Sequence, residues 1–472
     1  MPLPSSFWVD EMETVFVAEH GSHHPSLRVA PHAWNSPLYY RVAHASQMIF
    51  GSSEIAYRLP SLFAMGLALF LIARLAARLI HPQAAWFALF GCFALRGIAD
   101  QADDARPYAL GTAVAAAAVW FLVRWLDGAR WRDASLFVLC AALLWRVHLI
   151  YWPFYFVFVL YVLVRLFRAE TQVGWLRATL IFAALVLLLA PVAWDALALY
   201  RQAREHVIVE QPSLRDLTLA LKFGLVLLCG VGVLLFALLT RGPRPASRRA
   251  SASSATLLLA WWLCQPLVLF AFSRITGNSV FVSRYLYIAL PGAALAATLA
   301  AGYFIPPNRW KLPSIVLACG ALLFLGQWRQ PWPSHHPSDW RSAALAVRSL
   351  STDPATPILC PSPFIEAKAP VWRPDYALPG FLYCHLSVYP VGGKPFLLPF
   401  EMSPEAEQYV HSLFGTLNTR PRFLVYGWDR QVWSWGEWLS AQPELAGWHQ
   451  RRLGPFGDVE VILFENSARP TL

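Results

Sequence analysis

The sequence predicts an α-helical polytopic membrane protein that carries a small α/β domain at its C-terminal end. Of its 472 residues, 57% are hydrophobic and only 14% are charged, whereas a soluble chain carries about 25% charged residues. Apolar runs of about 17–25 residues, the length that crosses a bilayer as a helix, recur through residues 59–330. Residues 331–472 instead have a mixed, Pro-rich composition.

About ten of these apolar runs are candidate spans. The second run is short. The fourth and fifth are separated only by Trp152 and Pro153, where the proline is expected to break the helix. The candidate spans are residues 59–80, 84–99, 107–126, 133–150, 152–167, 177–199, 217–240, 255–273, 284–304 and 313–329.

The charges of the connecting loops predict the orientation of the spans. One alternating set of loops is basic, and the positive-inside rule places it in the cytoplasm. The basic set consists of Arg74, Arg78, Arg124, Arg130, Arg132, Arg165, Arg168, Arg177, residues 241–249, Arg309 and Lys311. The other set mixes its arginines with acids, namely Asp100, Asp103, Asp104, Glu205, Glu210 and Asp216. We therefore expect a multi-pass protein of the inner (plasma) membrane. Its N-terminal stretch, the loop 100–106 and everything after about residue 330 are expected to be extracytoplasmic.

The net charge of +10 is typical of basic cytoplasmic loops and is weak evidence for nucleic acid binding. The sequence also contains no zinc-finger spacing, no Walker A loop and no dinucleotide-binding glycine motif. We therefore expect the lipid bilayer, and no nucleic acid, as a partner.

The N-terminal segment, residues 1–58, contains no spanning run and is predicted to be the first extracytoplasmic loop. Its stretch "SPLYYRVAHASQMIFG" is mildly amphipathic and is expected to lie along the membrane surface. No signal peptide or span precedes Asp10 and Glu11. An extracytoplasmic position for these acids therefore leads us to expect a spanning helix upstream of the chain as given.

The C-terminal region, residues 331–472, is predicted to be an extracytoplasmic α/β domain. Its stretch "SDWRSAALAVRSL" begins with the capping residue Ser338 and is typical of an amphipathic helix. The stretches "TPILC", "RFLVYGW" and "VEVILFE" are typical of strands. Cys360 and Cys384 lie in this domain, and they are either a disulfide or two unpaired thiols.

Four motifs contain candidate functional residues, and each has a functional and a structural interpretation. In "FWVDE", Asp10 and Glu11 are a general base with its neighbour, or a solvated acidic turn. In "DQADDARPYAL", the charged residues Asp103, Asp104 and Arg106 form either a functional polar cluster together with Tyr108 or a local ion pair, which contributes little if it is exposed.

The third motif is "FVSRYLYIALPG", where Arg284 and Tyr285 open a span from the outer side. The arginine suits a phosphate, because its planar fork gives two charge-assisted hydrogen bonds. The structural alternative is snorkelling to the lipid headgroups. In the fourth motif, "LLWRVHLIYW", His148 interrupts an apolar run and is a functional or a hydrogen-bonded structural residue.

Metal ligands are not expected at the adjacent histidine pairs. His23–His24 and His335–His336 are each neighbours in sequence, and neighbouring side chains on a helix or strand point apart.

Taken in order, these motifs resemble the GT-C class of membrane glycosyltransferases. The similar branch is the dolichyl-phosphate-mannose–protein mannosyltransferase-like group, glycosyltransferase family 39, which includes lipopolysaccharide-core and aminoarabinose transferases. The resemblance covers residues 1–330. It rests on Trp8–Glu11, Ser36–Tyr40, Phe50–Ser61, Asp104–Tyr108 and Arg284–Pro291. Two features depart from the family pattern: no span precedes the first motif, and Asp104 replaces the common glutamate.

The resemblance implies a GT-C-like bundle and an inverting transferase. Such an enzyme moves a hexosyl or pentosyl group from a polyprenyl-phosphate donor to a lipid, glycan or protein acceptor outside the cytoplasm. Asp10 is then the base and Glu11 its support, whereas Arg106, Arg284, Tyr108 and Tyr285 bind the donor phosphate. Asp103, Asp104, His148 and Arg58 have supporting roles. No cofactor is firmly implied, and dependence on a divalent metal stays open.

Two rival classes remain. A transporter or flippase for lipid-linked sugars would use the same arginines without a base, but transporters often show internal repeats and none is clear in this sequence. A non-catalytic scaffold that presents residues 332–472 would leave the acid and arginine motifs unexplained.

Overall fold

The computed structural model describes residues 3–29, 37–203, 210–239, 250–324 and 336–466. The chain divides into two compact units. The helical unit contains residues 34–49 and 58–333, and the mixed unit contains residues 2–33, 50–57 and 334–472. Each unit is described by itself below. The predicted first loop, residues 1–58, is thus divided between them.

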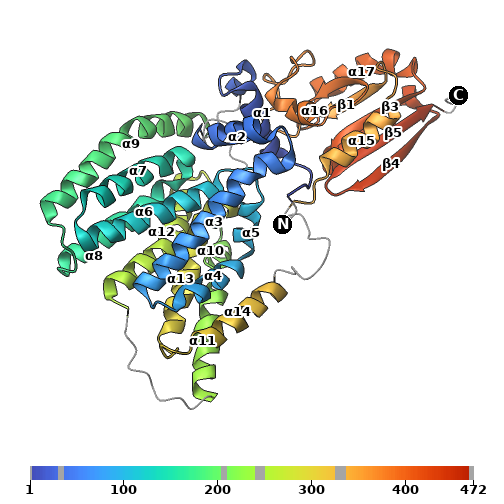
Figure 1. Ribbon diagram of the computed structural model, residues 1–472. Coiled ribbons are helices and arrows are strands. Elements are labelled where there is room, and N and C mark those ends of the chain that lie inside the picture. Colours follow the sequence, from blue (N-terminus) through green and yellow to red (C-terminus); the bar gives the residue numbers. More distant parts are fainter. Residues whose placement is uncertain (1–2, 30–36, 204–209, 240–249, 325–335, 467–472) are drawn as a thin grey trace. The chain divides into compact units, whose positions relative to one another are not determined.

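The helical unit is built from helices α2 to α14, which Figure 1 labels. Two short 3₁₀ segments, η3 (Leu149–Phe154) and η5 (Ser283–Ala289), interrupt the apolar runs. The helices are α2 (Pro37–Phe50), α3 (Glu54–Leu79), α4 (Ala84–Phe93), α5 (Arg96–Ala102), α6 (Tyr108–Gly128), α7 (Trp131–Val147), α8 (Tyr155–Phe167), α9 (Trp175–Ala203), α10 (Leu214–Ala220), α11 (Phe223–Leu239), α12 (Ala252–Thr276), α13 (Leu290–Gly302) and α14 (Lys311–Phe324).

All ten predicted apolar runs contain helix, but the count of about ten spans is not confirmed. Within the described residues, 6 helices are long and apolar enough to cross a membrane, or 7 if α10 and α11, which are bent by 52°, form one span. Helix α4 has only 10 residues and α14 has 14. At 1.5 Å per residue these helices extend for about 15–21 Å, less than the roughly 30 Å of the hydrocarbon core.

Small residues let the helices of this unit pack closely. Helix α13 is rich in alanine and almost completely buried. At Gly292, a Cβ atom would lie 2.4 Å from the backbone nitrogen of Trp262 on α12. Large apolar side chains instead cover the outer surface; Leu187 and Trp194 on α9 are each 75% exposed. Small buried residues with apolar residues outside are typical of a bundle in lipid, and the chain is a multi-pass membrane protein.

Several residues of the predicted basic loops meet at one end of the helical unit. Asp127, at the end of α6, accepts from Arg78 of α3 and from Arg165 of α8, both at 2.7 Å. Arg124 and Asp133 form a further pair at 3.1 Å. The ends of α3, α6 and α8 and the start of α7 therefore lie together, and all of them belong to the basic set of loops that the sequence places on one side of the membrane. The most basic loop segment, residues 241–249, lies outside the described residues.

The mixed unit contains a five-stranded sheet in the order β2-β1-β3-β5-β4. Strands β2, β1 and β3 are parallel, and β5 and β4 continue the sheet antiparallel. The strands are β1 (Pro357–Pro361), β2 (Lys394–Leu398), β3 (Arg422–Trp428), β4 (Trp448–Phe456) and β5 (Val459–Asn466). The helices are α1 (Val9–His20), α15 (Trp340–Leu350), α16 (Cys384–Val388), α17 (Pro404–Asn418) and α18 (Asp429–Ser440), with short 3₁₀ turns η1 (Pro25–Val29), η6 (Phe381–Tyr383) and η7 (Pro443–Leu445).

The three predicted strands are confirmed as β1, β3 and β5, and the predicted amphipathic helix is confirmed as α15. The predicted cap is wrong by one residue. Asp339, not Ser338, caps α15, because its carboxylate accepts from the backbone N–H of Ser342 at 3.1 Å. The disulfide interpretation is also wrong, since Cys360 and Cys384 are both free and buried.

The N-terminal helix α1 belongs to the mixed unit, together with the first turn of α3. The backbone N–H of Phe7 donates to the Tyr389 hydroxyl at 2.9 Å, and that hydroxyl donates to Glu54 at 3.0 Å. Arg341 of α15 pairs with the same carboxylate at 2.9 Å. Segments more than 280 residues apart in sequence are therefore joined around Glu54.

Candidate active site

The acid motif forms the first turn of α1 rather than a solvated turn. Glu11 is fully buried, and its carboxylate accepts from the backbone N–H of Trp8 at 3.3 Å. A glutamate at this position satisfies an N–H that the helix leaves unbonded, and it is stabilised by the positive end of the helix dipole. Trp8 itself stacks on His336 at 3.8 Å between ring centroids. Glu11 thus has a clear structural task.

Asp10 differs from Glu11 because its side chain is only partly buried. It lies on the same rigid first turn and shares the favourable helix dipole. Of the two acids, Asp10 is the less buried.

The second acidic motif links α5 to α6 in the helical unit. Asp103, Asp104 and Arg106 are exposed by only 4%, 6% and 4%, so these charges are buried. Buried charges are retained only where other groups compensate them. The hydroxyl of Ser61 on α3 donates to the carbonyl of Arg106 at 3.2 Å, and Ser61 also bonds the Tyr39 hydroxyl at 2.9 Å. Helices α2 and α3 thereby hold this linker in place.

Three of the predicted site residues contact one another through their rings. His148 lies 5.8 Å from Tyr108 and 5.3 Å from Tyr285, and the two tyrosine rings are 6.4 Å apart. They come from α6, from the junction of α7 and η3, and from η5. The separate motifs "ARPY", "RVH" and "SRY" therefore meet in one cluster.

Both predicted phosphate-binding arginines lie at this cluster. The positive charges of Arg106 and Arg284 both act on His148, which is 2% exposed. The Arg284 guanidinium also lies 5.6 Å from the centre of the Tyr285 ring. Two cations, two tyrosine hydroxyls and an imidazole thus form a concentrated set of hydrogen-bond donors, which suits an anionic ligand.

The backbone segments of the cluster are tied together by Gln265 of α12. Its amide nitrogen donates to the carbonyls of Ile150 and Tyr285, each at 3.1 Å. This side chain thereby joins η3 to η5. The sequence interpretation did not single out Gln265, although a buried amide beside a proline in an apolar run was an available signal.

Gly111 and Tyr151 were also not predicted. A Cβ atom at Gly111 would lie 2.3 Å from the Tyr151 ring, so the tyrosine packs directly against the backbone of α6. Its ring is 5.6 Å from that of His148. A glycine in a helix next to the "ARPY" motif was an available signal of this close contact.

The predicted site residues are distributed over both units. Asp10 and Glu11 belong to the mixed unit, and the remaining candidates belong to the helical unit. Arg58 is 1% exposed on α3 and is thus a buried charge of the helical unit. Among the described residues, no group of three His, Cys, Asp or Glu side chains is arranged to hold a metal ion. His335 lies outside the described residues.

The chain is similar in fold to solved structures of ArnT. This confirms the resemblance at the level of fold. No family model matches the chain, and no curated protein matches it.

The similar solved structures include ArnT from Cupriavidus metallidurans. The apo structure superimposes with a TM-score of 0.53 at 11% identity, and the structure bound to undecaprenyl phosphate with a TM-score of 0.53 at 13% identity. Each superposition covers 96% of this chain and 92% of the ArnT chain. At this identity the likeness concerns the fold, and it extends over nearly the whole of both chains.

Proposed function

We propose that this protein is an integral membrane glycosyltransferase that transfers a sugar from a polyprenyl-phosphate donor to an acceptor outside the cytoplasm. The observation that carries the proposal is the convergence of Arg106 and Arg284 on the cluster of Tyr108, His148 and Tyr285. The fold supports it, because ArnT, which shares the fold, has been solved bound to undecaprenyl phosphate.

The arginine cluster is assigned to the phosphate of the donor. When the bond between the anomeric carbon and the phosphate oxygen breaks, negative charge builds on the departing phosphate. Guanidinium groups stabilise that charge through charge-assisted hydrogen bonds, and they do so most strongly where water is excluded. Tyr108 and Tyr285 supply neutral donors to the same oxygens. Asp103 and Asp104 compensate the buried cations of this region.

Asp10 is assigned as the general base. Its carboxylate takes the proton of the acceptor hydroxyl while the hydroxyl oxygen attacks the anomeric carbon. The electron pair of the broken bond leaves with the lipid phosphate, and attack from the opposite face inverts the anomeric centre. Glu11 fixes the helix turn that carries Asp10, so its role in the reaction is one of positioning.

The variant Asp10→Asn tests this assignment in the full chain, reconstituted with labelled polyprenyl-phosphate sugars. Removal of a general base is expected to slow transfer by about a hundredfold or more and to leave donor binding intact. Asp353→Asn is the matched control, because this carboxylate is 55% exposed and pairs with Arg420 in the mixed unit. Undiminished transfer by Asp10→Asn would reject the base assignment.

One observation favours the alternative, a transporter or flippase for lipid-linked sugars. Helices α10 and α11 are bent by 52° at a short break, and broken helices are frequent in transporters. A transporter moves the intact lipid-linked sugar between leaflets and needs no base. Two results together would establish this alternative. The Asp10→Asn variant in liposomes would still move labelled donor across the bilayer, and the wild-type protein would transfer no sugar.

The proposal also places the protein in the inner (plasma) membrane, with the mixed unit outside the cytoplasm. The convergence of basic helix ends around Asp127 supports this orientation through the positive-inside rule. Topology reporters inserted at residue 245 and fused after residue 472 test it. They are expected to report opposite sides, and the same side from both would overturn the orientation.

A further inference from the structure

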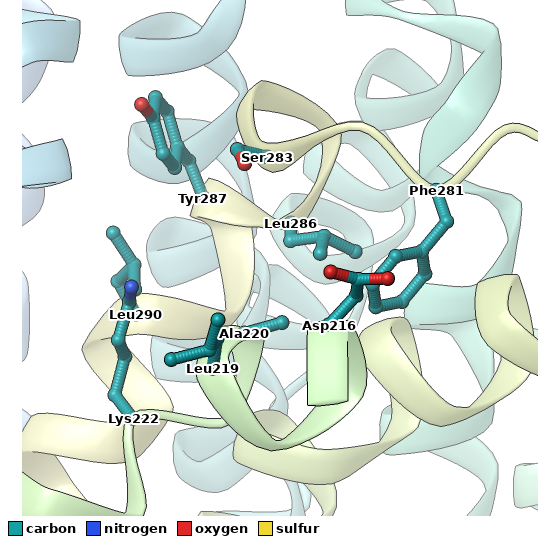
Figure 2. Close-up of a pocket in the computed structure, with 9 residues that line it drawn as sticks. All are labelled: Asp216, Leu219, Ala220, Lys222, Phe281, Ser283, Leu286, Tyr287 and Leu290. Carbon is teal, nitrogen blue, oxygen red and sulfur yellow. The ribbon is translucent and has the colours of Figure 1, made fainter. Parts of the chain in front are cut away.

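The pocket in Figure 2 belongs to the arginine cluster described above. It lies in the helical unit between α10 and η5, and Tyr287 of η5 is one of its lining residues. The Tyr287 ring is 6.5 Å from that of Tyr108, and Arg284 and Tyr285 of the cluster are neighbours in the same segment. The pocket is therefore an extension of that cluster and not a separate site.

A separate charged region surrounds Asp127, at the opposite end of helix α6. Tyr108, from the arginine cluster, is the first residue of this helix, and Asp127 lies in its last turn. The helix has 21 residues, which correspond to a length of about 32 Å at 1.5 Å per residue. Along α6, the Asp127 region is thus separated from the arginine cluster by a distance close to the roughly 30 Å thickness of the hydrocarbon core.

Asp127 holds two arginines from neighbouring helices in fixed positions. One of its oxygens accepts from Nε of Arg78 at 3.1 Å and from a terminal nitrogen of Arg78 at 2.7 Å. The other oxygen accepts from Arg165 at 2.7 Å. Arg165 also donates to the Tyr161 hydroxyl at 2.9 Å, and its side chain is only 10% exposed. One carboxylate therefore positions two guanidinium groups, but it cancels only one of their two charges.

Arg74 adds a further positive charge to this region. It precedes Arg78 by one helical turn on α3, so both side chains lie on the same face of the helix. Both guanidinium groups lie beside the Trp120 ring of α6, at 5.8 Å and 5.9 Å from its centre. Like charges at this spacing repel each other. Arg74 is exposed, and no acidic side chain among the residues that the structure describes pairs with it.

The region has a surplus of positive charge. Three arginines and one aspartate contribute to it, namely Arg74, Arg78, Arg165 and Asp127. Three positive charges and one negative charge leave a net charge of +2. Two neighbouring ion pairs are neutral and do not alter this balance, because Arg124 pairs with Asp133 and Arg168 pairs with Glu170. A ligand that matches the region in charge is therefore a dianion.

An exposed apolar stripe of α3 continues from Arg74. Phe63, Leu67 and Phe70 are 67%, 52% and 60% exposed, and their spacing of three or four residues places them on one face of the helix with Arg74. At 1.5 Å per residue, Phe63 lies about 16 Å along the helix axis from Arg74. One leaflet of the hydrocarbon core has a similar thickness, about 15 Å. With Arg74 at the level of the headgroups, the stripe therefore extends over the depth of the acyl chains.

We propose that the patch formed by Arg74, Arg78 and Trp120 binds the headgroup of a phospholipid that carries two phosphates, with its acyl chains along the stripe of α3. The phosphates accept charge-assisted hydrogen bonds from the arginines, and basic sites between spanning helices suit such headgroups. A zwitterionic phospholipid fits less well, because its ammonium group would approach a region of positive charge. A free phosphate would leave the apolar stripe unused. The binding of this lipid is independent of the proposed transfer reaction.

Binding of labelled cardiolipin, a phospholipid with two phosphates, to the full chain in detergent micelles tests the proposal. Arg74→Gln removes the exposed charge and is expected to weaken cardiolipin binding about tenfold, the loss of one hydrogen bond to a charged group. Arg74→Lys keeps the charge and is expected to bind more tightly than Arg74→Gln. The matched control is Arg215→Gln, because this arginine is exposed on α10 and lies outside the patch. This control is expected to bind cardiolipin like the wild type.

Competition experiments on the wild type test the same proposal without a variant. Cardiolipin is expected to bind about ten times more tightly than phosphatidylglycerol, which has one phosphate, and phosphatidylethanolamine is expected to bind most weakly. Soluble glycerol phosphate is expected not to compete at the concentration of the lipid. Equal affinities for cardiolipin and phosphatidylethanolamine would overturn the proposal, and so would unchanged cardiolipin binding in Arg74→Gln. Competition by glycerol phosphate would show that the patch binds free anions and would reject a lipid site.

Discussion

Acidification is expected to destabilise the mixed unit through His385. The imidazole lies on α16, is fully buried, and neither of its nitrogens has a hydrogen-bond partner among the described residues. Its ring lies 5.1 Å from Trp340, 6.3 Å from Tyr383 and 5.7 Å from Tyr426. Burial raises the pKa of both tyrosines, so these neighbours are uncharged. Burial without a charged partner lowers the pKa of His385 from 6.5 to about 3.

The sign and size of the effect follow from linkage. Between pH 6.5 and about 3, the unfolded chain binds a proton at His385 and the folded chain does not. Stability is therefore lost as the pH falls below 6.5. Each pH unit in this window contributes about 1.4 kcal/mol, so the loss at pH 5 is about 2 kcal/mol.

The assay is hydrogen exchange of the β3 and β5 amides in the full chain at pH 7.5 and pH 5.0, corrected for intrinsic exchange rates. His385→Asn removes the titrating group and is expected to reduce the acid sensitivity by about 2 kcal/mol relative to the wild type. The control is His449→Asn, at an exposed position of β4, and this variant is expected to keep the acid sensitivity of the wild type. Equal acid sensitivity in the wild type and His385→Asn would refute the reasoning.

Three further predictions concern packing, capping and the donor site. Gly292→Ala is expected to destabilise the helical unit by about 1–3 kcal/mol, because the added Cβ meets the backbone of α12. The control is Gly232→Ala, where the added Cβ meets no other atom within 4 Å. Equal thermal unfolding midpoints for the two variants would contradict the close packing at Gly292. Asp339→Ala is expected to lower the free energy of unfolding by about 1 kcal/mol, because it removes the N-cap of α15. Denaturant unfolding measures this loss, and an equal loss in Ser338→Ala would contradict the assignment of Asp339 as the cap. Arg284→Ala is expected to weaken donor binding about tenfold, and unchanged affinity would reject its phosphate role.

Much of the fold could be predicted because its signals are local. Apolar runs locate the helices, and the buried strands β1, β3 and β5 have strongly apolar sequences. Strand β4 was not predicted because none of its residues is buried, so its sequence lacks an alternating apolar pattern. The span count was not confirmed because composition locates an apolar segment more reliably than the points where its helix begins and ends.

The long-range arrangement could not be predicted from local signals. Nothing near Phe7 indicates that its backbone bonds to Tyr389, 382 residues away. The motifs did identify Tyr108, His148 and Tyr285, which the structure gathers, because ionisable and aromatic residues at the ends of apolar runs are unusual. Gln265 was missed because it acts through hydrogen bonds to distant segments, and Tyr151 because it packs against a distant helix.

The measurement that tests the central claim most directly is sugar transfer by the wild-type chain in proteoliposomes. The protein is supplied with polyprenyl-phosphate sugars labelled in the sugar, and with lipid, glycan and protein acceptors. We expect the label to move to an acceptor, with one polyprenyl phosphate released for each sugar transferred. Label that crosses the bilayer while still attached to its lipid, with no release of polyprenyl phosphate, would contradict the account.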